Sequence, residues 1–439
     1  MKGKPPAKGN SETAAILVVG TTPDYVARLQ RDMPQPLVFL TAQRFKDDPR
    51  LMGVPGSDIV FADLQSFEAT LEEMSSFQAL RNTRFSGAAC FDCESLIMAA
   101  RIASRLRLPF PPWQAIARSR NKFEARRTWT ALGINSPYAS LASGLEETLQ
   151  FFRSHGENVV LKPVSGSGSE LLFHCAFEEE VRLAVTIMEK ELRLRRGSPL
   201  FSPFPDPIHG QDIDPCRSWI AEEFVSGEEF SCDFVYQDEA IRLVRETGKV
   251  KATDKPFGSV LAYTFPPAYP PEFKEERLME TLKIAVHSLG FDSGFFMADY
   301  VVHEGFPVLI ELTPRPGGDS IPDLVKIASG RDILRLYLDF VTGSFRDPET
   351  VSMRPHTFAS INLFAPREGT VVRLDGSRIM ELPHVKSLFF KKEQGDRITL
   401  PPKDYDNRLL GYCIMATGPG LNLVEECRKL EDLLAVSIE

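Results

Sequence analysis

Two acidic residues in the second half of the sequence have the types and spacing to bind a metal ion. Asp299 lies inside the apolar run FFMADYVV and Glu311 inside VLIELT, and the short segment HEG between the runs predicts a β-hairpin. An acid within an otherwise apolar strand needs a counter-charge. If the hairpin pairs about HEG, both carboxylates point into one cleft and offer the hard oxygen ligands that Mg²⁺ on a polyphosphate requires. The alternative is a pair of solvated hairpin acids.

The residues that follow Glu311 extend this predicted site. Arg315 lies four residues further on, in ELTPRPGG, and prolines on both sides stiffen the loop. A planar guanidinium there suits a phosphate or a carboxylate, although a surface arginine in a proline-rich turn is the alternative. Gly317 and Gly318 allow a substrate to approach the backbone closely.

A second stretch of the sequence suits phosphate binding. Lys162 ends the apolar run VVLK, and a loop of serine and glycine follows it from Ser165 to Ser169. The ammonium group supplies a point charge for phosphate oxygens, and the backbone N–H groups of the loop can close over them. A flexible link is the alternative, and the loop is not a Walker A motif because G-x-x-x-x-G-K-[ST] is absent.

A strand that runs into a short link, within AEEFVSGEEF at 221–230, can serve an adenine base. Its backbone C=O and N–H groups can meet the adenine edge, and an acid just beyond can take the ribose hydroxyls.

The first 110 residues predict a parallel, doubly wound sheet, because apolar strands alternate with amphipathic helices. The expected strands are 14–20, 36–41, 58–63 and 87–92, and the expected helices are 66–80 and 94–106. The dinucleotide pattern G-x-G-x-x-G is missing, which disfavours an oxidoreductase. After the break at PFPPW, Ser119 is predicted to cap a helix that ends at Gly133.

The remaining elements place the predicted site on strands of a largely β region. Strands are expected at 218–225 and 230–236 with a turn at SGE between them, at 240–246, and in the hairpin at 294–302 and 306–313. Helices are expected near 178–194, 271–289 and 320–342. The proline-rich segment 197–217 predicts a surface loop or lid. The last ninety or so residues read as mostly β with a closing helix.

Composition excludes several classes of function. The 439 residues include 51 Lys and Arg against 60 Asp and Glu, and the net charge of −9 gives no general attraction to nucleic acid or to an anionic membrane. The absence of an 18-residue apolar window predicts no membrane span, and the N-terminus lacks a secretory pattern. Seven scattered cysteines are typical of reduced thiols in the cytoplasm.

These motifs, in this order and over nearly the whole chain, resemble the ATP-grasp superfamily and more narrowly its carboxylate–amine (L-amino acid or dipeptide) ligases. The resemblance implies an α/β and α+β protein with the ATP-grasp fold. In it, residues 11–115 form the N-terminal pre-grasp domain, 116–240 the first subdomain or nucleotide lid, 241–345 the second subdomain with the metal and substrate site, and 346–439 a β-rich C-terminal lid region. Residues 1–10 are predicted to be a disordered tail.

The resemblance also implies roles for individual residues. The nucleotide would be bound by two lysines, by the Ser–Gly loop and by the adenine link, which are Lys122, Lys162, Ser165, Gly166, Ser167, Gly168, Ser169, Glu222, Glu223, Phe224, Val225 and Glu229. Within the link, backbone groups of Glu223 and Val225 would meet the adenine and Glu229 the ribose.

The metal and catalytic roles follow from the same resemblance. Asp299 and Glu311 would hold the metal, and Thr313 stands where the family places an asparagine, so that a hydroxyl or a bridging water would replace that ligand. Arg315 matches the arginine of E-x-N-x-R-x-G-G and would act in catalysis. Either Lys249 or Lys251 would supply a further basic group, and the choice between them stays open.

The implied activity is an ATP-dependent ligation through an acylphosphate, with Mg²⁺, or Mn²⁺ in its place, as the metal. The partners would be small-molecule carboxylate and amine substrates, with no nucleic acid or membrane, in a cytoplasmic protein for which a homodimer is a possible assembly. Two alternatives stay open. One is a biotin-carboxylase-like enzyme that makes carboxyphosphate, and the other is a nucleotide-binding ATP-grasp protein with weakened catalysis.

Overall fold

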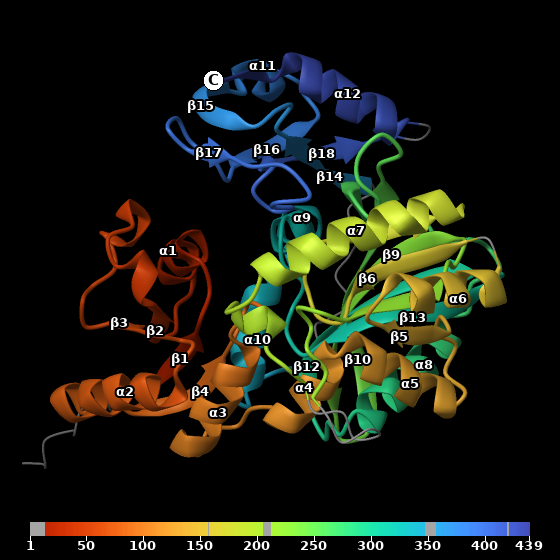
Figure 1. Ribbon diagram of the computed structural model, residues 1–439. Helices are drawn as coiled ribbons and strands as arrows, with labels where there is room; N and C mark the ends of the chain where they lie inside the picture. Colours follow the sequence, from red (N-terminus) through yellow and green to blue (C-terminus); the bar gives the residue numbers. More distant parts are fainter. Residues whose placement is uncertain (1–13, 157, 205–211, 347–356, 419–420) are drawn as a thin grey trace, which may run out of the picture. The chain divides into compact units, whose positions relative to one another are not determined.

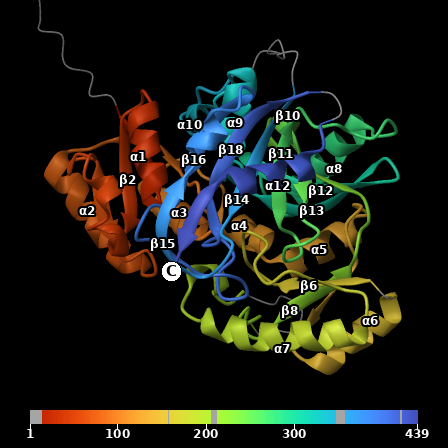
Figure 2. The same ribbon diagram turned by 90° about the horizontal axis from the view of Figure 1, so that it is seen from above.

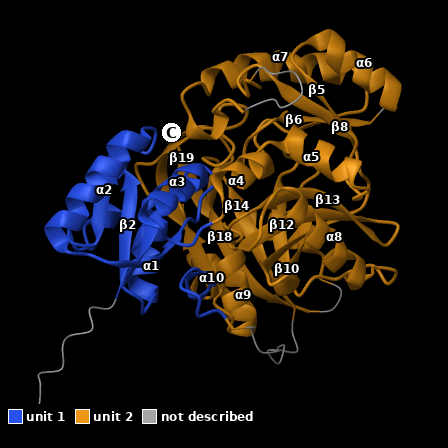
Figure 3. Cartoon of the chain, turned by 90° about the horizontal axis from the view of Figure 1, so that it is seen from below, with its two compact units in different colours: residues 1–110, 337–345 blue, residues 111–336, 346–439 orange. Residues whose placement is uncertain are grey.

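The computed structural model describes residues 14–156, 158–204, 212–346, 357–418 and 421–439 (Figure 1). The tail predicted for residues 1–10 lies outside the described residues, as does the middle of the predicted lid segment 197–217. The chain divides into two compact units (Figure 3). The first consists of the residues up to Phe110 together with the later segment Tyr337–Phe345, and the second consists of Pro111–Leu336 and Arg346–Glu439. The five-part division expected from the sequence stays a prediction.

The first unit contains the parallel sheet that the alternation of strands and helices predicts. Its strands follow the order β3-β2-β1-β4, and every neighbouring pair is parallel. They are β1 (Ala15–Val19), β2 (Leu37–Ala42), β3 (Ile59–Ala62) and β4 (Phe85–Ala89). The helices are α1 (Pro23–Asp32), α2 (Phe67–Arg81) and α3 (Leu96–Leu106), with short 3₁₀ turns at Gln43–Phe45 and Pro49–Leu51.

The second unit begins with two helices whose junction corrects one sequence prediction. The helices are α4 (Trp113–Arg120) and α5 (Lys122–Ala131), and Asn121 between them is the N-cap, since its side chain accepts a hydrogen bond from the Glu124 N–H at 3.1 Å. The prediction that Ser119 caps this helix is therefore wrong. Ser119 lies within α4, where its hydroxyl instead donates to the Leu312 carbonyl at 2.5 Å.

A small antiparallel sheet follows, with strand order β5-β8-β6-β7. Its strands are β5 (Ala139–Ala142), β6 (Val159–Pro163), β7 (Phe173–Cys175) and β8 (Trp219–Glu223), and its helices are α6 (Leu145–His155) and α7 (Glu178–Leu194). Trp219 is fully buried, and its indole N–H donates to the Thr148 hydroxyl at 3.1 Å. That hydrogen bond joins α6 to the sheet. A 3₁₀ turn at Pro199–Phe201 follows α7.

A large antiparallel sheet carries the predicted metal hairpin. Its strand order is β13-β12-β9-β10-β11-β14-β18-β16. These strands are β9 (Glu228–Gln237), β10 (Ala240–Lys251), β11 (Val260–Phe265), β12 (Gly294–His303), β13 (Phe306–Thr313), β14 (Thr357–Phe364), β16 (Val385–Phe390) and β18 (Leu409–Thr417). Beside it are α8 (Glu275–Ser288) and α9 (Ile321–Ser329), and α10 (Ile333–Val341) follows α9 along the chain.

The link between β8 and β9 joins the two sheets. The sequence predicts two strands with a turn at SGE between them, and the structure shows that β8 belongs to the small sheet and β9 to the large one. Gly227 in this link has φ +143°, and a Cβ there would lie 2.3 Å from the Val302 carbonyl oxygen. Because only glycine tolerates that contact, the link can lie tightly against β12.

The C-terminal residues complete the large sheet and add a small one. Strands β15 (Gly369–Asp375), β17 (Arg397–Ile398) and β19 (Ala435–Ile438) form a three-stranded sheet, accompanied by α11 (Ser377–Met380) and α12 (Leu423–Leu433). Helix α12 packs across β11 and β14 (Figure 2). Ile361, Leu410 and Leu430 lie in the core that these elements share. None of the helices in the described part of the chain has the length and apolar composition needed to cross a bilayer.

The packing of α8 gives a test of this fold. Leu282 is fully buried, whereas Ile284 on the same helix is 40% exposed. Leu282→Ala is expected to lower the free energy of unfolding by about 2–5 kcal/mol, because the side chain is lost and a cavity is left. Ile284→Ala is the control and should change it by about 0.5 kcal/mol or less. Chemical denaturation measures both, and equal effects would contradict the assigned face of α8.

Candidate functional site

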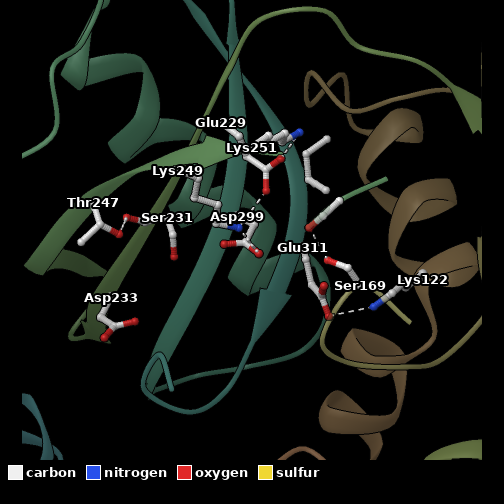
Figure 4. Close-up of polar contacts among 12 residues, drawn as sticks. Lys122, Ser169, Glu229, Ser231, Asp233, Thr247, Lys249, Lys251, Asp299 and Glu311 are labelled. Atoms are coloured by element: carbon white, nitrogen blue, oxygen red, sulfur yellow. Dashed lines mark hydrogen bonds and ion pairs between the residues drawn. The ribbon is translucent and has the colours of Figure 1, made fainter. Parts of the chain in front are cut away.

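The hairpin brings the two predicted metal ligands together. Asp299 on β12 and Glu311 on β13 are register partners of the antiparallel pair, which has a local irregularity after Asp299. Partners in an antiparallel ladder project to the same face of the sheet. Figure 4 shows both carboxylates in one region, with lysines beside each. The hairpin predicted from the apolar runs about HEG is confirmed.

Lysine ammonium groups balance the negative charge of both carboxylates. Lys122 Nζ lies 2.8 Å from Glu311 Oε1, and Lys249 Nζ lies 2.9 Å from Asp299 Oδ2 and 2.8 Å from Glu229 Oε1 (Figure 4). Burial alone would raise the pKa of Glu311, but Lys122 and Arg120 lower it to about 2. Burial alone would lower the pKa of Lys249, but Asp299 and Glu229 raise it above its ordinary value. Glu311 and Lys249 are therefore both charged at neutral pH.

The carboxylate pair fits a divalent cation. Asp299 uses Oδ2 for its ion pair, and its buried Oδ1 has no hydrogen-bond partner within the described part of the chain. A buried carboxylate oxygen without a partner is costly unless a donor or a cation satisfies it. No group of three or more His, Cys, Asp or Glu residues with metal-binding geometry occurs among the described residues. Two protein carboxylates suit Mg²⁺ bound mainly through substrate phosphates and water.

A second charged network lies on the small sheet. Lys162 Nζ is 2.5 Å from Glu222 Oε1, and Arg126 Nε is 3.1 Å from Glu222 Oε2. Burial lowers the pKa of Lys162 to about 8, and the Glu222 carboxylate opposes that shift. The charge of Lys162 also lowers the pKa of Glu311, so the two networks are within electrostatic reach of each other.

Side-chain hydrogen bonds hold the Ser–Gly loop from 165 to 169 at its first and last residues. The Ser165 hydroxyl donates to the Leu200 carbonyl at 2.6 Å, and the Ser169 hydroxyl donates to the Gly258 carbonyl at 3.0 Å. Gly168 has φ +64°, and a Cβ there would lie 2.5 Å from a carboxylate oxygen of Asp406. Because the hydroxyls of Ser165 and Ser169 donate to these carbonyls, we expect phosphate contacts in this loop to come from backbone N–H groups and from the Ser167 hydroxyl.

The link predicted for adenine is bordered by aromatic rings. Phe224 is 37% exposed, and its ring lies 4.5 Å from that of His174 and 6.2 Å from that of Phe257, measured between centroids. The backbone N–H of Glu223 donates to the Tyr138 carbonyl at 3.0 Å, so that N–H is already used within the protein. The adenine contacts of Glu223 and Val225 stay predictions.

Glu229 is bound to two lysines instead of standing alone. It accepts from Lys249 and pairs with Lys251, which also lies over the Phe257 ring at 5.7 Å. Burial would raise the pKa of Glu229, but the two lysines lower it to about 2. Lys249 thus contacts both Asp299 and Glu229, whereas Lys251 pairs with the other carboxylate oxygen of Glu229. The predicted ribose contact of Glu229, and the choice between the lysines, stay predictions.

The loop after β13 holds Arg315 close to its own backbone. Arg315 Nη1 donates to the Pro316 carbonyl at 2.6 Å, and the Arg315 N–H donates to the Thr313 carbonyl at 2.9 Å. Thr313 is buried at the end of β13, on the same face as Glu311. The Gly317 N–H donates to Asp233 Oδ1 at 3.0 Å.

Two buried arginines belong to the site and were missed by sequence reasoning. Arg120 lies 3.6 Å from Glu311 and donates to the Gly166 carbonyl at 3.0 Å, so it joins the carboxylate to the Ser–Gly loop. Arg126 binds Glu222 and donates to the Ile310 carbonyl. A signal existed in RSRNKFEAR, because Lys122 and Arg126 are four residues apart and share a helix face.

Comparison with known proteins agrees with this geometry. The ATP-grasp domain family model matches residues 155–323. An uncharacterized protein, y4rH, of Sinorhizobium fredii (strain NBRC 101917 / NGR234) is 26% identical over 320 residues, which cover 73% of this chain. A D-alanine–D-alanine ligase of Acidovorax ebreus (strain TPSY) is 26% identical over 227 residues, or 48% of this chain. The matches span only 61% and 58% of the lengths of these two relatives.

A solved structure shares the fold over almost the whole chain. The L-amino acid ligase from Bacillus licheniformis superposes with a TM-score of 0.73 at 18% identity, and the match covers 97% of this chain and 99% of that one. The expected fold is thus confirmed, with its parallel N-terminal sheet and its antiparallel sheets around the charged site. Residues 155–323 thus match the ATP-grasp domain family, and the chain has the fold of the solved L-amino acid ligase.

Proposed function

We propose that this protein is an ATP-dependent ligase that joins an amino acid or a related carboxylic acid to an amine through an acylphosphate. One observation carries the proposal. Asp299 and Glu311 are cross-strand partners, and separate lysines, Lys249 and Lys122, bring positive charge to each of them. A site with both hard oxygen ligands and fixed ammonium groups suits a metal-bound triphosphate.

In the first step, an oxygen of the substrate carboxylate attacks the γ-phosphorus of ATP. The bond from that phosphorus to the bridging oxygen breaks, and ADP leaves. Mg²⁺ held by Asp299 and Glu311 would offset charge on the β- and γ-phosphates when bound. Lys122 and Lys162 are positioned to hold phosphate oxygens, and because they are already fixed by Glu311 and Glu222, little reorganisation is needed.

In the second step, the nitrogen of the amine attacks the acyl carbon. The carbon–oxygen bond to phosphate breaks, inorganic phosphate leaves, and the nitrogen loses a proton to give the amide. Arg315 is the group of the 314–318 loop that can stabilise the charge of the acylphosphate. Because an acylphosphate hydrolyses readily, the Ser–Gly loop has a purpose as a cover that keeps water out.

The proposal is tested by a screen for ADP and phosphate release. Paired amino acids and other acids and amines are supplied with Mg²⁺-ATP, and mass spectrometry then searches for a condensation product. A product whose mass equals acid plus amine minus water is expected, with one ADP formed for each product. ATP hydrolysis that requires bicarbonate, is stimulated by free biotin and gives no condensation product would contradict the proposal and favour the carboxylase alternative.

Removal of one charged group should disable the site while leaving the fold intact. Glu311→Gln or Lys162→Ala is expected to lower the rate of ATP turnover by about 100-fold or more, the scale seen when one preorganised electrostatic group is lost. The matched controls are Glu304→Gln, at the exposed turn of the same hairpin, and Lys190→Ala, whose side chain is 77% exposed. Steady-state ADP release measures all four, and near-normal turnover in both site variants would refute the site.

The lowered pKa of Lys162 predicts how ATP binding depends on pH. The ammonium is charged below the folded-state pKa of about 8 and becomes neutral as the pH rises through that value. ATP affinity should therefore weaken above about pH 8, by up to about tenfold per pH unit. Titration of a fluorescent ATP analogue measures it. Lys162→Arg should flatten the dependence because guanidinium stays charged. A wild-type affinity that is constant up to about pH 9.5 would contradict the prediction.

A further inference from the structure

An ion pair buried in the large sheet contacts the loop that carries Arg315. Asp233 on β9 and Arg245 on β10 are register partners, and their Oδ1 and Nη2 atoms lie 2.8 Å apart. Both side chains are 0% exposed, so neither can touch a substrate directly. The proposed reaction assigns neither residue a role, although Asp233 lies on the same face of the sheet as Ser231 and Asp299 (Figure 4).

The ion pair contacts the loop backbone at Gly317 and hydrogen-bonds to it. The Gly317 N–H donates to the same Asp233 oxygen at 3.0 Å, so one carboxylate oxygen binds both the loop and the guanidinium. A Cβ at Gly317 would lie 2.3 Å from Arg245 Nη2 and 3.2 Å from Asp233 Oδ1. The absence of a Cβ at Gly317 therefore lets the loop backbone lie directly against the ion pair, and a larger residue there would displace the guanidinium.

Arg245 is itself fixed by neighbouring hydroxyls. Its Nη1 donates to Ser231 Oγ at 3.0 Å and to Thr247 Oγ1 at 2.8 Å. Ser231 is the register partner of Asp299 on β12. The contacts thus run from the strand beside the metal carboxylate, through the guanidinium and Asp233, to the backbone two residues after Arg315.

The energetics of this pair favour a geometric role over a stabilising one. Moving both charges from water into the protein interior is costly, and well-packed apolar residues in their place often make a protein equally stable or more stable. In addition, Asp233 Oδ2 and Arg245 Nε have no hydrogen-bond partner within the described residues. Because burial of this ion pair is costly, its role is best explained by the 314–318 loop that it holds in position.

We propose that Asp233 and Arg245 are positioning residues that fix the 314–318 loop and thereby aim Arg315 at the reacting phosphoryl or acyl group. The inference rests on the proposed function, because the role of Arg315 gives the fixed loop its purpose. A displacement of about 1 Å in a catalytic group can lower the rate about 100-fold. Loss of the contact between the ion pair and the loop should therefore lower the turnover rate measurably.

The structural half of the proposal is tested by hydrogen exchange in the full chain. Asp233→Ala should speed exchange in the peptide that covers 314–318 more than in peptides from α8. Asp233→Asn keeps an oxygen acceptor for the Gly317 N–H and should restore part of the protection. Leu282→Ala is the control for general destabilisation and should show the opposite distribution. Unchanged exchange at 314–318 in Asp233→Ala would overturn the proposal, and if that variant does not fold, Asp233→Asn is compared with the wild type instead.

The functional half is tested by a double-mutant cycle with Arg315→Ala. Asp233→Ala should lower kcat by about 100-fold while the KM for ATP changes by about threefold or less. The double variant should be no slower than Arg315→Ala alone, because both act through the same group. Multiplied defects would overturn the proposal. If Arg315→Ala retains normal turnover, the role assigned to Arg315 fails, and the exchange experiment still decides whether the pair fixes the loop.

Discussion

Charge compensation between the hairpin carboxylates and lysines from distant segments is the constraint on which the site depends. Asp299 and Glu311 are neighbours on one sheet face, where two uncompensated negative charges would repel each other. Lys249 reaches Asp299 from β10, and Lys122 reaches Glu311 from the first turn of α5. Because each carboxylate is held by a cation from another element, the groups that would meet a nucleotide are already placed when it arrives.

This constraint explains why the small and large sheets must meet. The small sheet supplies Lys162 and Glu222, and the large sheet supplies the carboxylate pair. Arg126 on α5 binds both, through the Glu222 side chain and the Ile310 carbonyl next to Glu311. The sheets are also joined covalently by the link at 224–227. Nucleotide groups that lie between them would therefore contact residues whose relative positions Arg126 fixes.

Local sequence patterns were enough to place the hairpin and most elements, but not the partners of buried charges. The apolar runs about HEG predicted β12 and β13 closely, because strand period and turn chemistry are local properties. The strands on either side of SGE were predicted, but sequence spacing does not reveal that they join different sheets. Arg120 and Arg245 were not singled out, since an arginine has the same local signal whether it is solvated or buried against an acid formed elsewhere in the chain.

The pairing of β11 with β14 makes the C-terminal residues inseparable from the strands that carry the site. Strands β14, β18 and β16 extend the same hydrogen-bonded sheet as β10 and β11. Truncation before β14 would leave β11 as an unpaired edge and would open Leu261 and Ala262 to water. Such an edge is a template for aggregation, and the pairing of β14 with β11 closes it.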